Sequence, residues 1–90
     1  MYLLNVDPDL DRKLKKMEKK RHVELEIINK KILEIQQNPH HFKNLSWPLG
    51  HLKRVHIYKS FVLTFQVHED IKTVELKDYD HHDNVYHNKR

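Results

Sequence analysis

Apolar residues recur with a helical period up to about residue 37 and with a strand period from residue 52 onward. A short apolar segment at residues 2–6 precedes the helical region and predicts a strand. Spacings of three and four residues then predict two amphipathic helices. Their apolar stripes consist of Leu10, Leu14 and Met17 in the first helix and of Leu25, Ile28, Ile32 and Ile35 in the second. The two helices are expected to form a hairpin that offers an apolar face to another element.

Local signals mark the ends of this hairpin. Asp7 followed by Pro8 predicts a helix start, because the Asp side chain accepts unpaired amide hydrogen bonds and proline at the first helical position loses none. Asn38-Pro39 predicts the end of the second helix, because proline disfavours helical geometry in the residue before it. An irregular loop follows, and Trp47 is expected to pack beneath it.

Three strands are predicted after this loop, at residues 52–57, 61–67 and 71–79. Tight turns separate them, which indicates an antiparallel meander. The predicted fold class is α+β, with an N-terminal strand and a two-helix hairpin packed on a small, mainly antiparallel β-sheet. All of it is expected to form a single domain of residues 1–90.

Alternation assigns the strand side chains to two faces. One face is expected to contact the helices and carries Val55, Ile57, Phe61, Leu63, Phe65 and Val67. The other carries Arg54 and His56 beside Val62, Thr64 and Gln66. This half-polar face is expected to be open, which makes it a candidate site. Extrapolated along the last strand, the alternation puts His81 on the face of Glu75, Lys77 and Tyr79.

Composition narrows the classes of function. The chain has no cysteine, which excludes disulfides and thiolate metal sites, and no apolar run approaches the roughly 20 residues of a membrane span. A soluble, cytoplasmic protein with no membrane partner is expected. Lys and Arg number 17 against 13 Asp and Glu, and nine histidines add charge at low pH, so a polyanionic partner is favoured.

The carboxy-terminal segment, residues 73–86, concentrates groups that can carry acid/base chemistry. It ends in two imidazoles, two carboxylates and a phenol. The nine histidines raise the question of a metal, but no spacing matches a closed site, and adjacent histidines on an extended chain point to opposite faces. No metal and no cofactor are therefore expected. The single glycine excludes a glycine-rich phosphate loop.

The order of these segments resembles a known family. A short strand, a hairpin ending in Asn38-Pro39, the stretch Leu49 to Ile57, the apolar strand Phe61 to Val67 and a terminal His-His-Asp-Asn-Val-Tyr are similar to the RelE/ParE toxin superfamily, and most of all to its RelE-like branch. The resemblance implies a microbial-RNase-like sandwich and a toxin of a type II toxin–antitoxin module that cleaves mRNA in the ribosomal A site. It also implies neutralisation by a RelB-like antitoxin and contact with operator DNA only through the antitoxin complex.

Metal-free RNA cleavage needs a base for the 2'-OH, cations for the phosphate and an acid for the leaving 5' oxygen. His82 is the preferred acid/base residue, and the choice between it and His81 stays open. Arg54 and Lys53 are expected to hold phosphate, with His56 in the site and Tyr86 orienting or stacking on a base. Further RNA contacts are expected from His51 and Lys59.

Two positions depart from the superfamily pattern. Val62 stands where many relatives have an arginine inside the third strand, and Asp80 or a histidine replaces an arginine common just before the terminal motif. Phosphate stabilisation is then expected from Arg54, Lys53 and protonated histidines. Two other hypotheses remain: a ParE-like inhibitor of DNA gyrase, and a non-catalytic antitoxin-binding or corepressor module. Histidine substitutions that spare folding distinguish a nuclease from both alternatives. Binding to gyrase distinguishes the gyrase inhibitor from the non-catalytic module.

Overall fold

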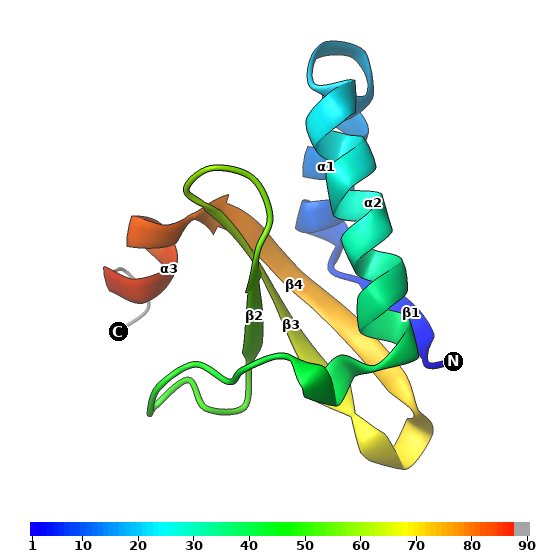
Figure 1. Cartoon of the computed structure of the whole chain (residues 1–90), viewed down its shortest axis with the longest axis vertical. Helices are drawn as coiled ribbons and strands as arrows, with labels where there is room; N and C mark the ends of the chain where they lie inside the picture. The colour runs from blue at the N-terminus through cyan, green and yellow to red at the C-terminus, as the bar shows by residue number, and fades with distance from the viewer. Residues whose placement is uncertain (88–90) are drawn as a thin grey trace.

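A four-stranded sheet with the order β1-β4-β3-β2 forms the centre of the molecule in the computed structural model (Figure 1). The structure describes the backbone of residues 1–87 and the side chains up to residue 85. β1 (Leu3–Val6) pairs in parallel with β4 (Thr73–His81). β3 (Phe61–His68) pairs antiparallel with both β4 and β2 (Lys53–His56). The predicted α+β fold with a mainly antiparallel sheet is confirmed.

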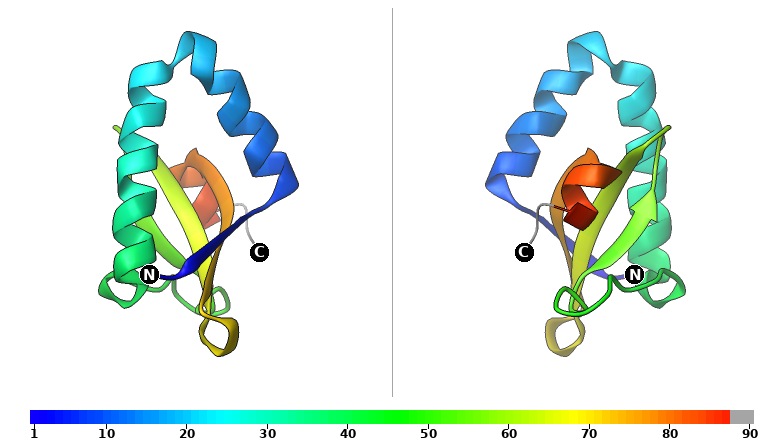
Figure 2. Two further views of the ribbon diagram at one scale, coloured as in Figure 1. Left: turned by 90° about the vertical axis from the view of Figure 1, so that its right-hand side faces the viewer. Right: turned by 90° about the vertical axis from the view of Figure 1, so that its left-hand side faces the viewer.

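Two helices, α1 (Pro8–Lys20) and α2 (His22–Gln37), meet at their tip and diverge toward one face of the sheet (Figure 2). The predicted start of α1 is confirmed, since the Asp7 side chain accepts hydrogen bonds from the backbone nitrogens of Asp9 at 2.9 Å and Leu10 at 3.4 Å. α2 ends before the short 3-10 helix η1 (Pro39–His41), as the proline predicts.

The main core lies between this hairpin and the sheet. Its helical half consists of Leu10, Met17, Ile28, Ile32 and Ile35, and its sheet half consists of Leu63, Phe65, Val74, Leu76 and Tyr79. Phe61, Val55, Ile57 and Val67 pack against it and are partly buried. The face that alternation assigned to the helices is therefore confirmed.

The opposite face is not open, in contrast to the prediction. Val62 and Thr64 are buried there, with exposed fractions of 0% and 4%. The irregular loop before β2 folds back and brings Leu45 onto Val62, and Val85 from the short helix α3 (His82–His87) completes a second small core. Leu45 packs in this core, whereas Trp47 is 91% exposed, so the predicted packing of Trp47 is wrong.

A β-bulge changes the alternation of β4. Thr64 pairs with Asp78, but the next residue of β3, Phe65, pairs with Leu76, so Lys77 is an extra residue. Tyr79 and His81 consequently share the helix-facing side with Leu76, whereas Glu75 lies on the other side. The extrapolation was right to group His81 with Tyr79 and wrong to group both with Glu75. β4 begins after the tight turn η2 (Glu69–Ile71), so it starts and ends two residues later than the predicted range of 71–79.

Candidate active site

The register of the sheet aligns polar residues from three strands on the face away from the helices. His56 pairs with Val62, which pairs with Asp80, and in the neighbouring row Arg54 pairs with Thr64, which pairs with Asp78. The end of β4 therefore lies one strand away from the basic strand β2. This arrangement joins the two segments that the sequence singled out.

His82 stands at the junction between β4 and α3. Its backbone nitrogen donates to the carbonyl of Ser60 at 2.7 Å, which fixes the start of α3 against the turn between β2 and β3. The His82 ring centroid lies 6.4 Å from that of His56. Two imidazoles that are far apart in the sequence thus lie within one small surface region.

His81 lies on the other side of the strand end. Its ring packs edge-on against Phe61, with centroids 5.8 Å apart, and its centroid is 5.9 Å from that of His82. The backbone N–H of Asp83 donates to Nδ1 of His81 at 3.2 Å. The three imidazoles form a row in the order His56, His82, His81, with His82 at the centre and next to both others.

A partly buried network links the end of β4 to the helix hairpin. The Tyr79 hydroxyl donates to the Glu24 carboxylate, and Arg21 donates to it from Nε at 3.0 Å and from a terminal nitrogen at 2.9 Å. Burial opposes ionisation of Glu24, but the hydrogen bonds from Arg21 and Tyr79 outweigh it and lower the pKa of Glu24. Burial and the bond to Glu24 raise the pKa of Tyr79, so its hydroxyl is a donor.

Phe61 connects this network to the site. Its ring stacks on Tyr79 at 5.3 Å between centroids and receives the Arg21 guanidinium 5.7 Å from its centroid. Because His81 packs on the same ring, the hairpin, β3 and β4 are linked through one aromatic contact. The imidazole row is therefore supported by packed elements rather than by a loose terminus.

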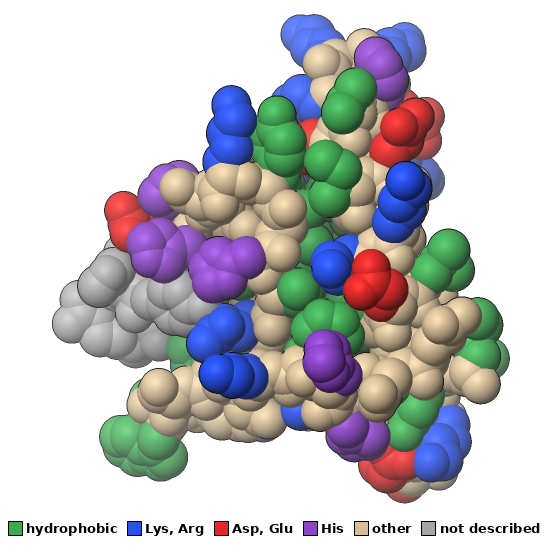
Figure 3. All heavy atoms as spheres, viewed as in Figure 1, with side chains coloured by type: hydrophobic (Ala, Val, Ile, Leu, Met, Phe, Trp, Pro, Cys, Tyr) green, Lys and Arg blue, Asp and Glu red, His purple; other side chains and the backbone are tan. Residues whose placement is uncertain are grey.

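The predicted cations differ in their surroundings. Arg54 is half-buried on the His56 side of β2. Lys53 faces the other way, and its ammonium donates to the Phe42 carbonyl and to Asn44 Oδ1, both at 3.0 Å, so it braces the loop. His51 is exposed in that loop, and Lys59 is exposed in the turn after β2. Figure 3 shows histidines gathered beside basic side chains on this face.

Sequence reasoning missed two parts of the site. Asp83 lies against both histidines, with Oδ1 3.3 Å from His82 Nδ1 and Oδ2 3.8 Å from His81 Nδ1. Val85 anchors α3 in the second core. The adjacency of Asp83 to the histidine pair was the available signal. Tyr86 belongs to α3, but its side chain lies outside the described part of the structure.

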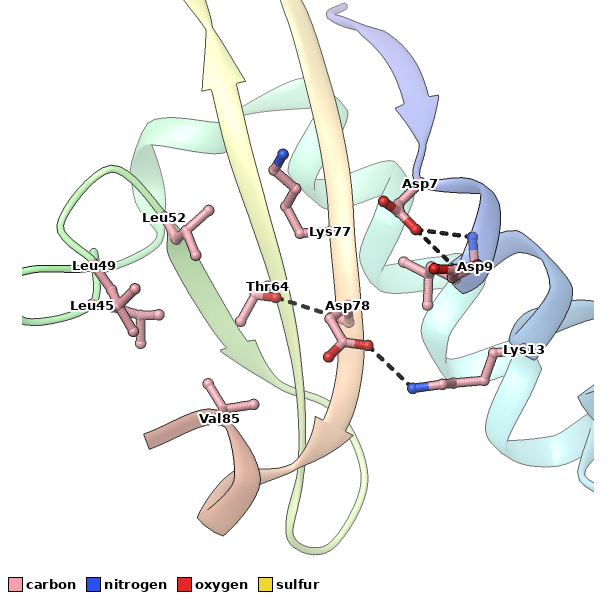
Figure 4. A pocket seen from close by; sticks show the side chains of 11 residues that line it. Asp7, Asp9, Lys13, Leu45, Leu49, Leu52, Thr64, Lys77, Asp78 and Val85 are labelled. Atoms are coloured by element: carbon pink, nitrogen blue, oxygen red, sulfur yellow. Dashed lines mark hydrogen bonds and ion pairs between the residues drawn. The ribbon is translucent and has the colours of Figure 1, made fainter. Parts of the chain in front are cut away.

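A separate cavity of about 340 Å³ opens on the same face of the sheet, between the start of α1 and the second core (Figure 4). One side of the cavity is apolar and consists of Leu45, Leu49, Leu52 and Val85, across the sheet from Lys13 of α1. Carboxylates also line the cavity, among them Asp78, which pairs with Lys13 at 3.1 Å. The cavity shares α3 with the histidine row, so a molecule that fills it would contact the element that starts with His82.

Comparison with known proteins identifies the family. No family model matches the chain. The chain is 53% identical over 90 residues to RelE4, a candidate toxin of Methanocaldococcus jannaschii, covering 100% of this chain and 96% of that protein. The chain belongs to the RelE toxin family.

Solved structures agree with this RelE-family assignment at the level of the fold. A YoeB/ParE toxin from Agrobacterium tumefaciens superposes with a TM-score of 0.77 at 13% identity, covering 89% of this chain and 98% of that one. The toxin–antitoxin complex RelBE of E. coli gives a TM-score of 0.72 at 21% identity, covering 90% and 96%. Within residues 1–87 of this RelE-family chain, no helix is long and apolar enough to cross a membrane.

Proposed function

We propose that this chain is the toxin of a toxin–antitoxin pair and cleaves mRNA in the ribosomal A site by metal-free acid/base catalysis. Membership of the RelE family and the convergence of His56 and His82 support the proposal. The 6.4 Å between the two ring centroids is the observation that carries it. An acid and a base that each reach one oxygen of a phosphodiester at about 2.6–3.2 Å must stand on either side of it.

The reaction is a transesterification. A base accepts the proton of the 2'-OH, the 2' oxygen bonds to phosphorus, and the bond from phosphorus to the 5' oxygen breaks. An acid donates a proton to that leaving oxygen, which leaves a 2',3'-cyclic phosphate and a 5'-hydroxyl. His82 is assigned the main acid/base role because it adjoins both other imidazoles, and His56 or His81 is the complementary group.

Charge stabilisation is assigned to Arg54, which shares the face of His56, and to histidines in their cationic form. Lys53 contributes by holding the loop next to the site, since its ammonium already has two acceptors. Val62 and Asp80 stand where relatives often carry arginine. Position 62 is fully buried in the second core, so phosphate stabilisation is assigned to other residues. His51, Lys59 and Tyr86 are assigned to RNA contact.

An antitoxin of the RelB type is the proposed partner that silences the site. The E. coli RelBE and Mycobacterium tuberculosis RelBE2 structures are toxin–antitoxin complexes. On this chain, α2 exposes Val23 and Leu33, with 57% and 54% of each residue accessible, and the apolar cavity adjoins α3. A partner segment that is disordered when free could fold onto such surfaces, and a net charge of +4 favours an acidic one. Operator DNA is proposed to be reached only through that complex.

Primer extension on a defined mRNA, with and without translating ribosomes, tests the nuclease proposal. We expect cuts inside codons that require ribosomes, and their loss with His82→Ala. His22→Ala is the matched control, because it removes an exposed histidine at the start of α2. Growth arrest without any cut, or equal cutting by His82→Ala, would contradict the assignment. Arrest with gyrase binding would point to a ParE-like toxin.

A further inference from the structure

Three consecutive residues at the junction of β4 and α3 bring potential metal-ligand atoms close together. His81, His82 and Asp83 each offer one ligand atom, and these three atoms lie within 4.8 Å of one another. The Asp83 carboxylate is central, with Oδ1 3.3 Å from His82 Nδ1 and Oδ2 3.8 Å from His81 Nδ1.

The local backbone makes this convergence possible. Adjacent side chains of an extended strand point to opposite faces, which is the reason why the sequence predicted no metal here. β4 ends at His81, however, and α3 begins at His82. The change from strand to helix between the two residues turns both imidazoles toward the carboxylate that follows, so the premise of the prediction does not hold at this junction.

The spacing fits a tetrahedral ion. Zinc binds imidazole nitrogen and carboxylate oxygen at about 2.0–2.2 Å, so two such ligands at a tetrahedral angle stand roughly 3.3–3.5 Å apart. The separation of 3.3 Å from His82 Nδ1 to Asp83 Oδ1 lies in that range, and the separation of 3.8 Å from His81 Nδ1 to the other oxygen, Oδ2, lies just beyond it. The N–H of Asp83 donates to His81 Nδ1 at 3.2 Å, so an ion bound at this nitrogen would replace that hydrogen bond.

We infer that His81, His82 and Asp83 form a three-ligand site for a divalent cation of the zinc class. Two imidazoles and one carboxylate are the donor set of zinc sites that keep a position open for water. His56 is not one of these ligands and lies next to His82, with the ring centroids 6.4 Å apart. All three ligand side chains are partly exposed, with accessible fractions of 42%, 43% and 64%, so an ion reaches them directly from solvent.

A cation bound at this three-ligand site would also affect RNA cleavage, an inference that rests on the proposed nuclease function. A cation on Nδ1 of His82 takes up the lone pair of that nitrogen and leaves the ring proton on Nε2, so the bound imidazole can no longer accept a proton at either nitrogen. The site therefore makes the proposed cleavage sensitive to zinc-class cations, as an inhibitor and not as a cofactor.

Calorimetric titration of the untagged protein with zinc chloride tests the site without reference to RNA. We expect one equivalent to bind, and His82→Ala and Asp83→Asn each to weaken binding about tenfold or more. Asp83 is well exposed, so its asparagine variant is expected to fold, which circular dichroism checks. His22→Ala should bind like the native chain. Native-like binding by Asp83→Asn and His82→Ala, or no binding by the native chain, would overturn the site.

A cleavage assay with and without zinc chloride separates the two proposals. The cleavage rate of each chain with zinc is compared with its own rate without zinc, and a smaller fractional inhibition of Asp83→Asn than of the native chain supports both the site and its consequence. Zinc binding without any effect on cleavage would overturn the inhibitory consequence and leave the site intact. Zinc binding by a chain that never cleaves RNA would overturn the proposed function alone.

Discussion

The two faces of the sheet are closed by different means. On one face, two helices of 13 and 16 residues supply a continuous apolar cover over Leu63 and Phe65. On the other, a loop and a six-residue helix cover little more than Val62, and the imidazole row lies at the rim of that cover. The first face is expected to contribute most of the stability, and the second is less covered and leaves the imidazoles accessible. Substitutions on the first face should therefore mainly lower stability, and substitutions on the second face should mainly lower cleavage activity.

The largest loss of stability is expected from Phe65→Ala, on the helix-covered face. Phe65 is fully buried in the main core, and truncation of such a side chain costs about 3–5 kcal/mol through lost burial and the remaining cavity. Urea denaturation followed by circular dichroism measures the change in the free energy of unfolding. A change below about 1 kcal/mol would show that this face is not the main source of stability.

Tyr79→Phe is expected to cost about 1–3 kcal/mol near neutral pH, because it removes a donor from the buried Glu24 carboxylate. The lowered pKa of Glu24 means that its ionised form stabilises the fold fully above the ordinary value of 4.5, and that this contribution is lost as pH falls through the folded-state pKa. The stability gap between native and variant chains should then narrow in acid. Unfolding measured at about pH 7 and about pH 3 checks this, and a constant gap would contradict it.

Val85→Ala, on the thinly covered face, should have a smaller effect on stability and a larger one on chemistry. It removes two methyl groups from a side chain that is 2% exposed, for about 1–2 kcal/mol. The loss loosens α3, which carries His82, so cleavage by the still-folded variant should fall about 10–100-fold. Paired denaturation and primer-extension assays compare the two effects. Unchanged cleavage would mean that α3 packing does not position His82.

Trp47→Ala is expected to change the free energy of unfolding by no more than about 0.5 kcal/mol. Its side chain is almost fully exposed, while Leu45 of the same loop fills the second core. Leu45→Ala is the matched comparison and should destabilise more, which the same urea denaturation measures. A larger effect from Trp47→Ala would place the tryptophan in a packed position and contradict the described loop.

The helix-covered face could be predicted from the sequence because helical spacing and strand alternation each specify a buried side directly. The stripe ending in Ile35 and the run around Phe65 needed no long-range information. The second face depends on tertiary contacts that no local pattern encodes. Leu45 and Trp47 lie two residues apart in one irregular loop, and either could have filled the space over Val62.

The candidate site shows the same division. The imidazoles of His56 and His82 were predictable as candidates from residue type and order, but their mutual position depends on register. The bulge at Lys77 moves Tyr79 and His81 to the helix side, and a strand pattern alone does not reveal where a bulge falls. α3 was missed because its six residues, with Asp, Asn and His among them, have little intrinsic helix preference.

The central claim is that this RelE-family chain cleaves RNA by attack of the 2'-OH, with His82 transferring a proton. Analysis of the cleaved ends on ribosome-bound mRNA tests it most directly, with a second mRNA that carries a single 2'-deoxy residue at the cut. We expect a 2',3'-cyclic phosphate and a 5'-hydroxyl from the first mRNA and no cut in the second. A 3'-hydroxyl with a 5'-phosphate, or cleavage at the deoxy residue, would contradict it.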